Sequence, residues 1–137
     1  MAENKQRTVL VVEDSPTQAL SLRLMLEAEG LRVLTAVNGR IGVDMAYLHR
    51  PDVVVLDLEM PAMNGFEASA LISGDYRTDH TPVIIMTSHN DDERNIEKSK
   101  MLGAARFIRK GDFSHQLLLE ELRSLNILGS KTGTEVP

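Results

Sequence analysis

Short runs of apolar and β-branched residues alternate along the chain with longer segments whose apolar residues recur every three or four positions. The short runs predict five strands, over residues 8–12, 32–36, 53–56, 82–86 and 105–108. The run Val53, Val54, Val55, Leu56 has no polar position. Such a run is typical of a strand that is buried on both faces of a parallel sheet.

The longer segments predict five helices. Ser15 suits the cap of the first helix, Pro16 suits its first turn, and Gln18 is placed to reach back to the cap. Apolar residues then continue at helical spacing until Gly30, at Ala19, Leu22, Met25 and Leu26. The second helix is predicted from Asn38 to the residue before Pro51, with Ile41, Met45 and Leu48 on one face. The third is predicted over residues 66–72, and the fourth from the acidic turn 90–93 to near Gly103. The fifth is predicted from about residue 112 to residue 126 or 128.

This alternation predicts an α/β fold, a doubly wound (βα)5 sandwich in which helices cover both faces of one parallel sheet. We expect the flavodoxin-like strand order 2-1-3-4-5. The domain is predicted to span residues 7–128, after an N-terminal tail of residues 1–6. Residues 129–137 lack an apolar period and are expected to form a flexible tail or linker stub.

Reactive side chains stand at the ends of four predicted strands: Glu13 and Asp14 after the first, Asp57 after the third, Thr87 and Ser88 after the fourth, and Lys110 after the fifth. In the expected order these ends are neighbours, at the sheet edge where α/β domains bind ligands. Three carboxylates in one crevice favour a hard divalent cation such as Mg²⁺. A hydroxyl and an ammonium add a hydrogen-bond donor and a positive charge. The set predicts a site where a carboxylate accepts a phosphoryl group.

Asp57 is the candidate nucleophile, because it ends a buried strand just before a turn. Pro61 is expected to stop the strand. Gly65 is expected to permit a backbone conformation that other residues resist.

Composition narrows the class of protein. The 137 residues, 42% of them apolar, suffice for one hydrophobic core, and no stretch approaches the roughly 20 apolar residues that span a bilayer. The absence of cysteine excludes disulfides and thiolate chemistry. The net charge of −5 argues against a broad basic face for nucleic acid. The polar N-terminus does not resemble a signal peptide, so the cytoplasm is the simplest location.

Four motifs now stand in order along the chain: VVEDSP at 11–16, LDLEMPAMNG at 56–65, MTS at 86–88, and GAA at 103–105 leading to Phe107 and Lys110. From about residue 8 to residue 125 the chain resembles the receiver domains of two-component response regulators, which include single-domain chemotaxis regulators. Each motif alone is weakly specific, whereas all four at matching strand ends are a strong signal.

The resemblance implies a role for each site residue. Asp57 would be phosphorylated by a histidine kinase or a histidine phosphotransfer protein, and Lys110 would pair first with Asp57 and then with the phosphoryl group. Mg²⁺, or alternatively Mn²⁺, would be bound by Asp14, by Asp57, by the backbone carbonyl of Glu59 and, through water, by Glu13. Thr87 and Phe107 would be the switch pair, and the fourth helix, fifth strand and fifth helix would form the output face for an unknown effector. A homodimer through that face stays open.

Two features depart from the family pattern or vary within it. Gly111 replaces the proline that usually follows the lysine, and we expect a trans Lys110–Gly111 bond because a cis bond before a non-proline residue costs about 3–4 kcal/mol. Glu59 and His89 stand two residues beyond Asp57 and Thr87, where side chains flank the path of the attacking water. We therefore expect Glu59 and His89 to set the lifetime of the phosphorylated state.

Three alternative functions are compatible with parts of this sequence. A pseudo-receiver would keep the fold for protein binding without phosphate, although the complete set of site residues argues against it. A phosphoaspartate-type hydrolase needs an acid/base two residues after the nucleophile, and Glu59 has that spacing although aspartate is usual. A flavin mononucleotide binder lacks the Ser/Thr/Gly-rich loop after the first strand, and aromatic residues make up only 4% of the chain.

Overall fold

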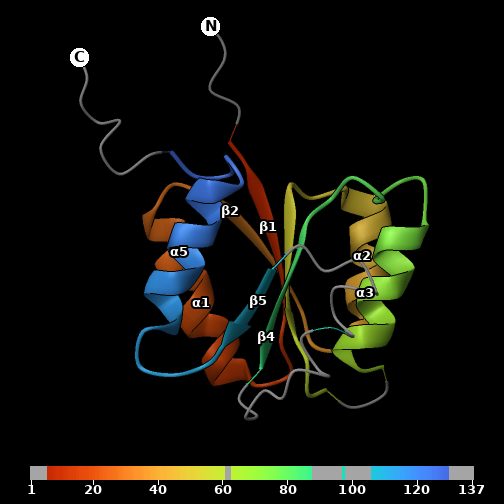
Figure 1. Cartoon of the computed structure of the whole chain (residues 1–137), viewed down its shortest axis with the longest axis horizontal. Helices are drawn as coiled ribbons and strands as arrows, with labels where there is room; N and C mark the ends of the chain where they lie inside the picture. The colour runs from red at the N-terminus through yellow and green to blue at the C-terminus, as the bar shows by residue number, and fades with distance from the viewer. Residues whose placement is uncertain (1–5, 61–62, 88–96, 98–105, 130–137) are drawn as a thin grey trace, which may run out of the picture.

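The structure is a computed structural model that describes residues 6–60, 63–87, 97 and 106–129 (Figure 1). Its five strands form one parallel sheet in the predicted order, β2-β1-β3-β4-β5. The strands are β1 (Thr8–Val12), β2 (Arg32–Ala36), β3 (Val53–Asp57), β4 (Val83–Thr87) and β5 (Arg106–Arg109). Asp57 and Thr87 are therefore the last residues of their strands and not the residues that follow them.

Helices cover both faces of the sheet, as predicted. They are α1 (Pro16–Ala28), α2 (Gly39–His49), α3 (Gly65–Gly74) and α5 (Ser114–Ser124). Helices α1 and α5 lie on one face, and α2 and α3 lie on the other (Figure 1). The helix predicted from residue 90 to residue 103 lies outside the described residues except for Glu97, which is helical.

The sheet separates two apolar layers, because alternate strand residues point to opposite faces. Val9, Val11 and Val55 pack with the apolar residues of α1 and α5. Leu10, Leu56 and Ile85 pack with those of α2 and α3. Both faces of β3 are buried, which confirms the prediction made from its unbroken apolar run.

Only one of the three apolar residues predicted to mark the buried face of α2 packs against the core, namely Met45, which is partly buried. Ile41 and Leu48 are 40% and 76% exposed, whereas Val43 and Ala46 are buried. The helix lies so close to β1 that a Cβ on Gly42 would come within 2.7 Å of Val12. Position 42 therefore requires glycine, because a side chain there would prevent this approach.

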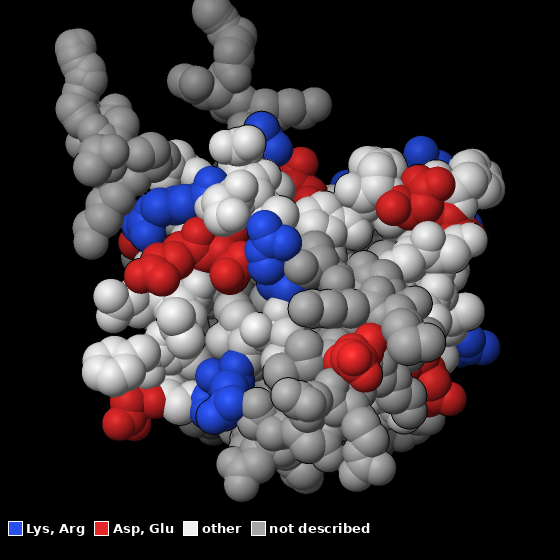
Figure 2. Space-filling view, viewed as in Figure 1, with Lys and Arg blue, Asp and Glu red and all other residues white. Residues whose placement is uncertain are grey.

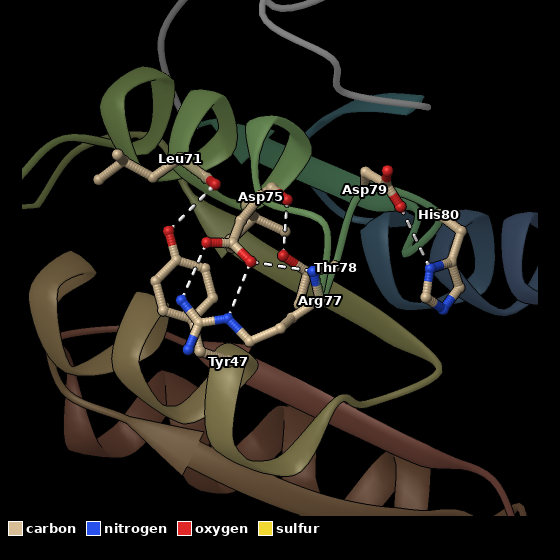
Figure 3. A network of polar contacts seen from close by, with 8 residues as sticks. Tyr47, Leu71, Asp75, Arg77, Thr78, Asp79 and His80 are labelled. Atoms are coloured by element: carbon tan, nitrogen blue, oxygen red, sulfur yellow. Dashed lines mark hydrogen bonds and ion pairs between the residues drawn. The ribbon is translucent and has the colours of Figure 1, made fainter.

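A polar network joins α2, α3 and the segment before β4 (Figure 3). The Arg77 guanidinium lies 4.0 Å from the centre of the Tyr47 ring and donates two hydrogen bonds to Asp75, at 2.8 and 2.9 Å. These bonds lower the pKa of Asp75 to about 2. The Tyr47 hydroxyl donates to the carbonyl of Leu71, 3.1 Å away. The network fastens α2 to α3 and to the segment that leads into β4.

The surface agrees with the charge balance of the sequence. Acidic and basic side chains are interspersed on the face shown in Figure 2, and the described residues there form no broad basic area. Within the described ranges, every helix is too short or too polar to cross a bilayer.

Candidate functional site

Strand register brings the predicted site residues to one edge of the sheet. Val12 pairs with Leu56, so Glu13 and Asp57 are the next residues on adjacent strands. On the other side of β3, Thr87 ends β4, and its carbonyl accepts a hydrogen bond from the Lys110 backbone N–H at 2.7 Å. The edge therefore assembles from β1, β3, β4 and the end of β5.

An acidic cluster lies at the centre of this edge. Glu13, Asp14 and Asp57 each offer a carboxylate oxygen, and these oxygens all lie within 4.8 Å of one another. Glu13 and Asp57 are only 4% and 6% exposed, whereas Asp14 is exposed. Lys110 supplies the nearby positive charge: its Nζ lies 3.3 Å from Asp57 Oδ1 and 3.4 Å from Glu13 Oε1.

The electrostatics of Asp57 follow from this arrangement. Burial, reinforced by the negative charge of Glu13, raises the pKa of Asp57 from 3.8 to about 6. Lys110 and a hydrogen bond from the Glu59 backbone N–H oppose the rise without cancelling it. One ammonium thus pairs with two of the three clustered carboxylates, and the excess negative charge would be relieved by a divalent cation. The donor set, all oxygen with one ligand open to solvent, fits Mg²⁺.

Thr87 and Glu59 contact each other beside the cluster. The fully buried Thr87 hydroxyl donates a hydrogen bond to the Glu59 carboxylate. The Glu59 backbone N–H donates to Asp57 Oδ1 at 3.3 Å. Glu59 therefore links the end of β4 to Asp57, a contact that its position in the sequence did not indicate.

The turn after Asp57 depends on Gly65 for a different reason from the one expected. The backbone of Gly65 does not adopt the left-handed conformation. A Cβ there would lie 2.8 Å from Leu58 Cα and 2.9 Å from the Asp57 carbonyl oxygen. Close packing of the start of α3 against the strand end, and not backbone strain, therefore accounts for this glycine.

Of the remaining predicted site residues, some lie in the described part of the chain and others lie outside it. Phe107 lies on β5, partly buried against the α2–α3 layer, while Ser88 and His89 lie outside the described residues. The described residues include no cis peptide bond, so the Lys110–Gly111 bond is trans as expected.

One contact of the site was missed. Gln18 was expected to complete the cap of α1, yet its Oε1 accepts a hydrogen bond from Lys110 Nζ at 3.0 Å. Sequence spacing does suggest that a glutamine in the first turn of α1 lies near the strand ends. It does not indicate whether that side chain turns back to the cap or outward to the lysine.

Fold and site together define a doubly wound α/β domain with an acidic, lysine-bearing site at its strand ends. A profile of the response regulator receiver domain matches residues 9–123. The chain is 42% identical over 102 residues to the protein PilH of Pseudomonas aeruginosa, covering 74% of this chain and 84% of PilH. This chain belongs to the response regulator receiver domain family and is a phosphorylation-controlled signalling switch.

Solved structures agree with this fold. The chemotaxis protein CheY4 of Vibrio cholerae superposes with a TM-score of 0.82 at 28% identity, covering 88% of this chain and 99% of CheY4. The receiver domain of the sensor histidine kinase PA1611 of Pseudomonas aeruginosa, with a magnesium ion in its active-site cleft, matches with a TM-score of 0.78 at 24% identity, covering 89% and 99%. Some curated relatives are longer, and the chain spans only 30–40% of three of them.

Proposed function

We propose that Asp57 accepts a phosphoryl group from a phosphohistidine of a histidine kinase or histidine phosphotransfer protein. A carboxylate oxygen of Asp57 attacks phosphorus, and the phosphorus–nitrogen bond of the donor breaks. The imidazole leaves with the electron pair and takes up a proton, and an acyl phosphate remains on Asp57. The observation that carries this proposal is a buried carboxylate held 3.3 Å from an ammonium inside an acidic cluster.

The metal ligands proposed are Asp14, Asp57, the backbone carbonyl of Glu59 and, through water, Glu13. Bound Mg²⁺, or Mn²⁺ in its place, supplies positive charge that neutralises the phosphoryl oxygens. The three converging carboxylates support this assignment, as does the magnesium ion in the PA1611 receiver domain. Lys110 moves its ammonium from Asp57 to a phosphoryl oxygen as the acyl phosphate forms.

The switch is proposed to act through Thr87 and Phe107. Phosphorylation adds nearly two negative charges and three acceptor oxygens at the strand ends. The Thr87 hydroxyl then exchanges its Glu59 partner for a phosphoryl oxygen, and Phe107 moves with it. The resulting change is read on the face of β5, α5 and the segment 90–103, by an effector or by a second copy of this chain.

Glu59 and His89 are proposed to set how long the acyl phosphate lasts.

The domain is proposed to end near residue 128, with residues 129–137 as its tail. A hydrolase acting in multiple turnovers is disfavoured, because residues 9–123 match the response regulator receiver domain.

Intact-mass measurement tests the function directly. The full chain is incubated with a small phosphodonor such as acetyl phosphate, with Mg²⁺ or with a chelator. We expect one phosphoryl group per chain with Mg²⁺, and none with the chelator or in Asp57→Asn. The matched control is Asp44→Asn, which removes an exposed carboxylate on α2 and should be phosphorylated like the wild type. Modification that persists in Asp57→Asn would overturn the assignment.

A further inference from the structure

The hydrogen bonds in the first turn of α1 differ from those expected of a capping box, in which the Gln18 side chain would bond to the Ser15 backbone N–H. Ser15 caps the helix, since its hydroxyl accepts a hydrogen bond from the Gln18 backbone N–H. The backbone N–H of Ser15, which a capping glutamine would satisfy, instead donates to Glu13 Oε2 at 3.1 Å. The Gln18 side chain is thereby released from capping and reaches Lys110.

Lys110 has three ammonium protons, and the described residues offer three acceptor oxygens. They lie on Gln18 at 3.0 Å, Asp57 at 3.3 Å and Glu13 at 3.4 Å. Gln18 is the nearest of the three and the only one that is neutral. Gln18 also approaches the Lys110 ammonium from a different element, because it belongs to α1 whereas the two carboxylates lie at the strand ends.

The Lys110 side chain is 21% exposed and borders an open space. A cavity of about 420 Å³ is lined by residues of both α1 and α5. These two helices share one face of the sheet (Figure 1). Its lining includes Gln18, Leu22, Lys110, Gly111 and His115. Gly111 adds no side chain of its own to the loop, and the space where its Cβ would lie is open. An ammonium without its α1 partner therefore has room to turn away from Asp57.

We propose that Gln18 is a positioning residue for phosphoryl transfer: its side-chain oxygen holds the Lys110 ammonium at the acidic cluster, against the open cavity beside it. The inference rests on the proposed function of Asp57. It adds that the rate of phosphorylation depends on a residue of α1 that is neither a nucleophile nor a proposed metal ligand. Hydrogen bonds to charged groups are among the stronger ones, and small misplacements of a reacting group slow a reaction steeply.

The test compares Gln18→Met, which keeps the side-chain length without an acceptor oxygen, with Gln18→Glu, which keeps the oxygen. Phosphorylation of the full chain by acetyl phosphate is followed at varied donor and Mg²⁺ concentrations. We expect Gln18→Met to lower the maximal rate about three- to tenfold, with an unchanged Mg²⁺ dependence. Gln18→Glu should stay within about twofold of the wild type. Thr17→Ala, an exposed change in the same turn, is the matched control.

A second readout reports on Lys110 without any phosphorylation. The rate at which an acylating reagent labels Lys110 is measured by peptide mass spectrometry in the metal-free protein of residues 1–137. We expect labelling to be about threefold faster in Gln18→Met, and close to the wild-type rate in Gln18→Glu and Thr17→Ala.

The outcomes separate this inference from the proposed function. If Lys110 is labelled at the wild-type rate in Gln18→Met, the positioning role of Gln18 is overturned. It is also overturned if Gln18→Glu is phosphorylated as slowly as Gln18→Met. If the wild type accepts no phosphoryl group while labelling changes as expected, the function assigned to Asp57 fails and the positioning of Lys110 stands.

Discussion

Replacing Asp57 with asparagine should stabilise the metal-free protein, although it abolishes phosphorylation. The Asp57 carboxylate is 6% exposed and shares its surroundings with the negative charge of Glu13. Folding therefore places a charge where it is poorly solvated, and one ammonium only partly compensates it. Asparagine keeps the shape and removes the charge.

The size of this stabilisation follows from the shift in the pKa of Asp57. A rise from 3.8 in the unfolded chain to about 6 in the folded protein corresponds to about 3 kcal/mol once the carboxyl is ionised in both states. Because the folded-state pKa is raised, the folded protein binds more protons between these two values. Stability consequently falls as the pH rises from 3.8 to about 6 and is constant above that. We expect Asp57→Asn to be more stable by about 1–3 kcal/mol at pH 7.5, and by about 1 kcal/mol or less at pH 4.5.

Urea unfolding in the presence of a chelator measures this difference at both pH values. Asp44→Asn serves as the control, because its carboxylate is exposed on α2 and its removal should leave stability nearly unchanged. Mg²⁺ at about 100 times its dissociation constant should then stabilise the wild type by about 2.7 kcal/mol, and Asp57→Asn by much less. A metal-free Asp57→Asn protein less stable than the wild type at pH 7.5 would refute the reasoning. A difference of equal size at both pH values would refute it too.

Three further predictions concern single residues. Both Gly111 and Gly30 have open space for a Cβ, but only Gly30 of these two has a positive φ, +88°. In urea unfolding, Gly111→Ala should therefore stabilise the protein by about 0.4–1 kcal/mol, whereas Gly30→Ala should destabilise it by about 1 kcal/mol. Similar shifts at both sites would contradict this use of backbone conformation. Thr87→Ala should still be phosphorylated but should lose most of the phosphorylation-dependent change in NMR shifts on β5; an undiminished change would count against the switch. Glu59→Ala and His89→Ala should each change the lifetime of the acyl phosphate, measured by the loss of intact mass after the donor is removed, and unchanged lifetimes in both would exclude the proposed tuning.

The sequence was sufficient for the fold because local pattern and global topology agree in this chain. Apolar runs of strand length alternate with helical periodicity, and that alternation is compatible with few arrangements other than a parallel sheet covered on both faces. The meeting of Glu13, Asp57 and Lys110 was predictable for the same reason, since the carboxyl ends of neighbouring parallel strands share an edge. The face by which α2 packs was not evident from its large apolar residues, because Gly42 allows closer contact than they do.

Tertiary structure alone decided how the polar side chains pair. Sequence spacing indicates that Gln18, Glu59 and Thr87 lie near the strand ends, but partners are selected by rotamers and distances that depend on the assembled edge. The Ser15 backbone N–H bonds to Glu13, which leaves Gln18 available for Lys110, and Thr87 bonds to Glu59. The raised pKa of Asp57 likewise requires the burial and the neighbouring charge that only the folded chain supplies. The order of residues along the chain thus determined which groups reach the site, and three-dimensional packing determined which of them touch.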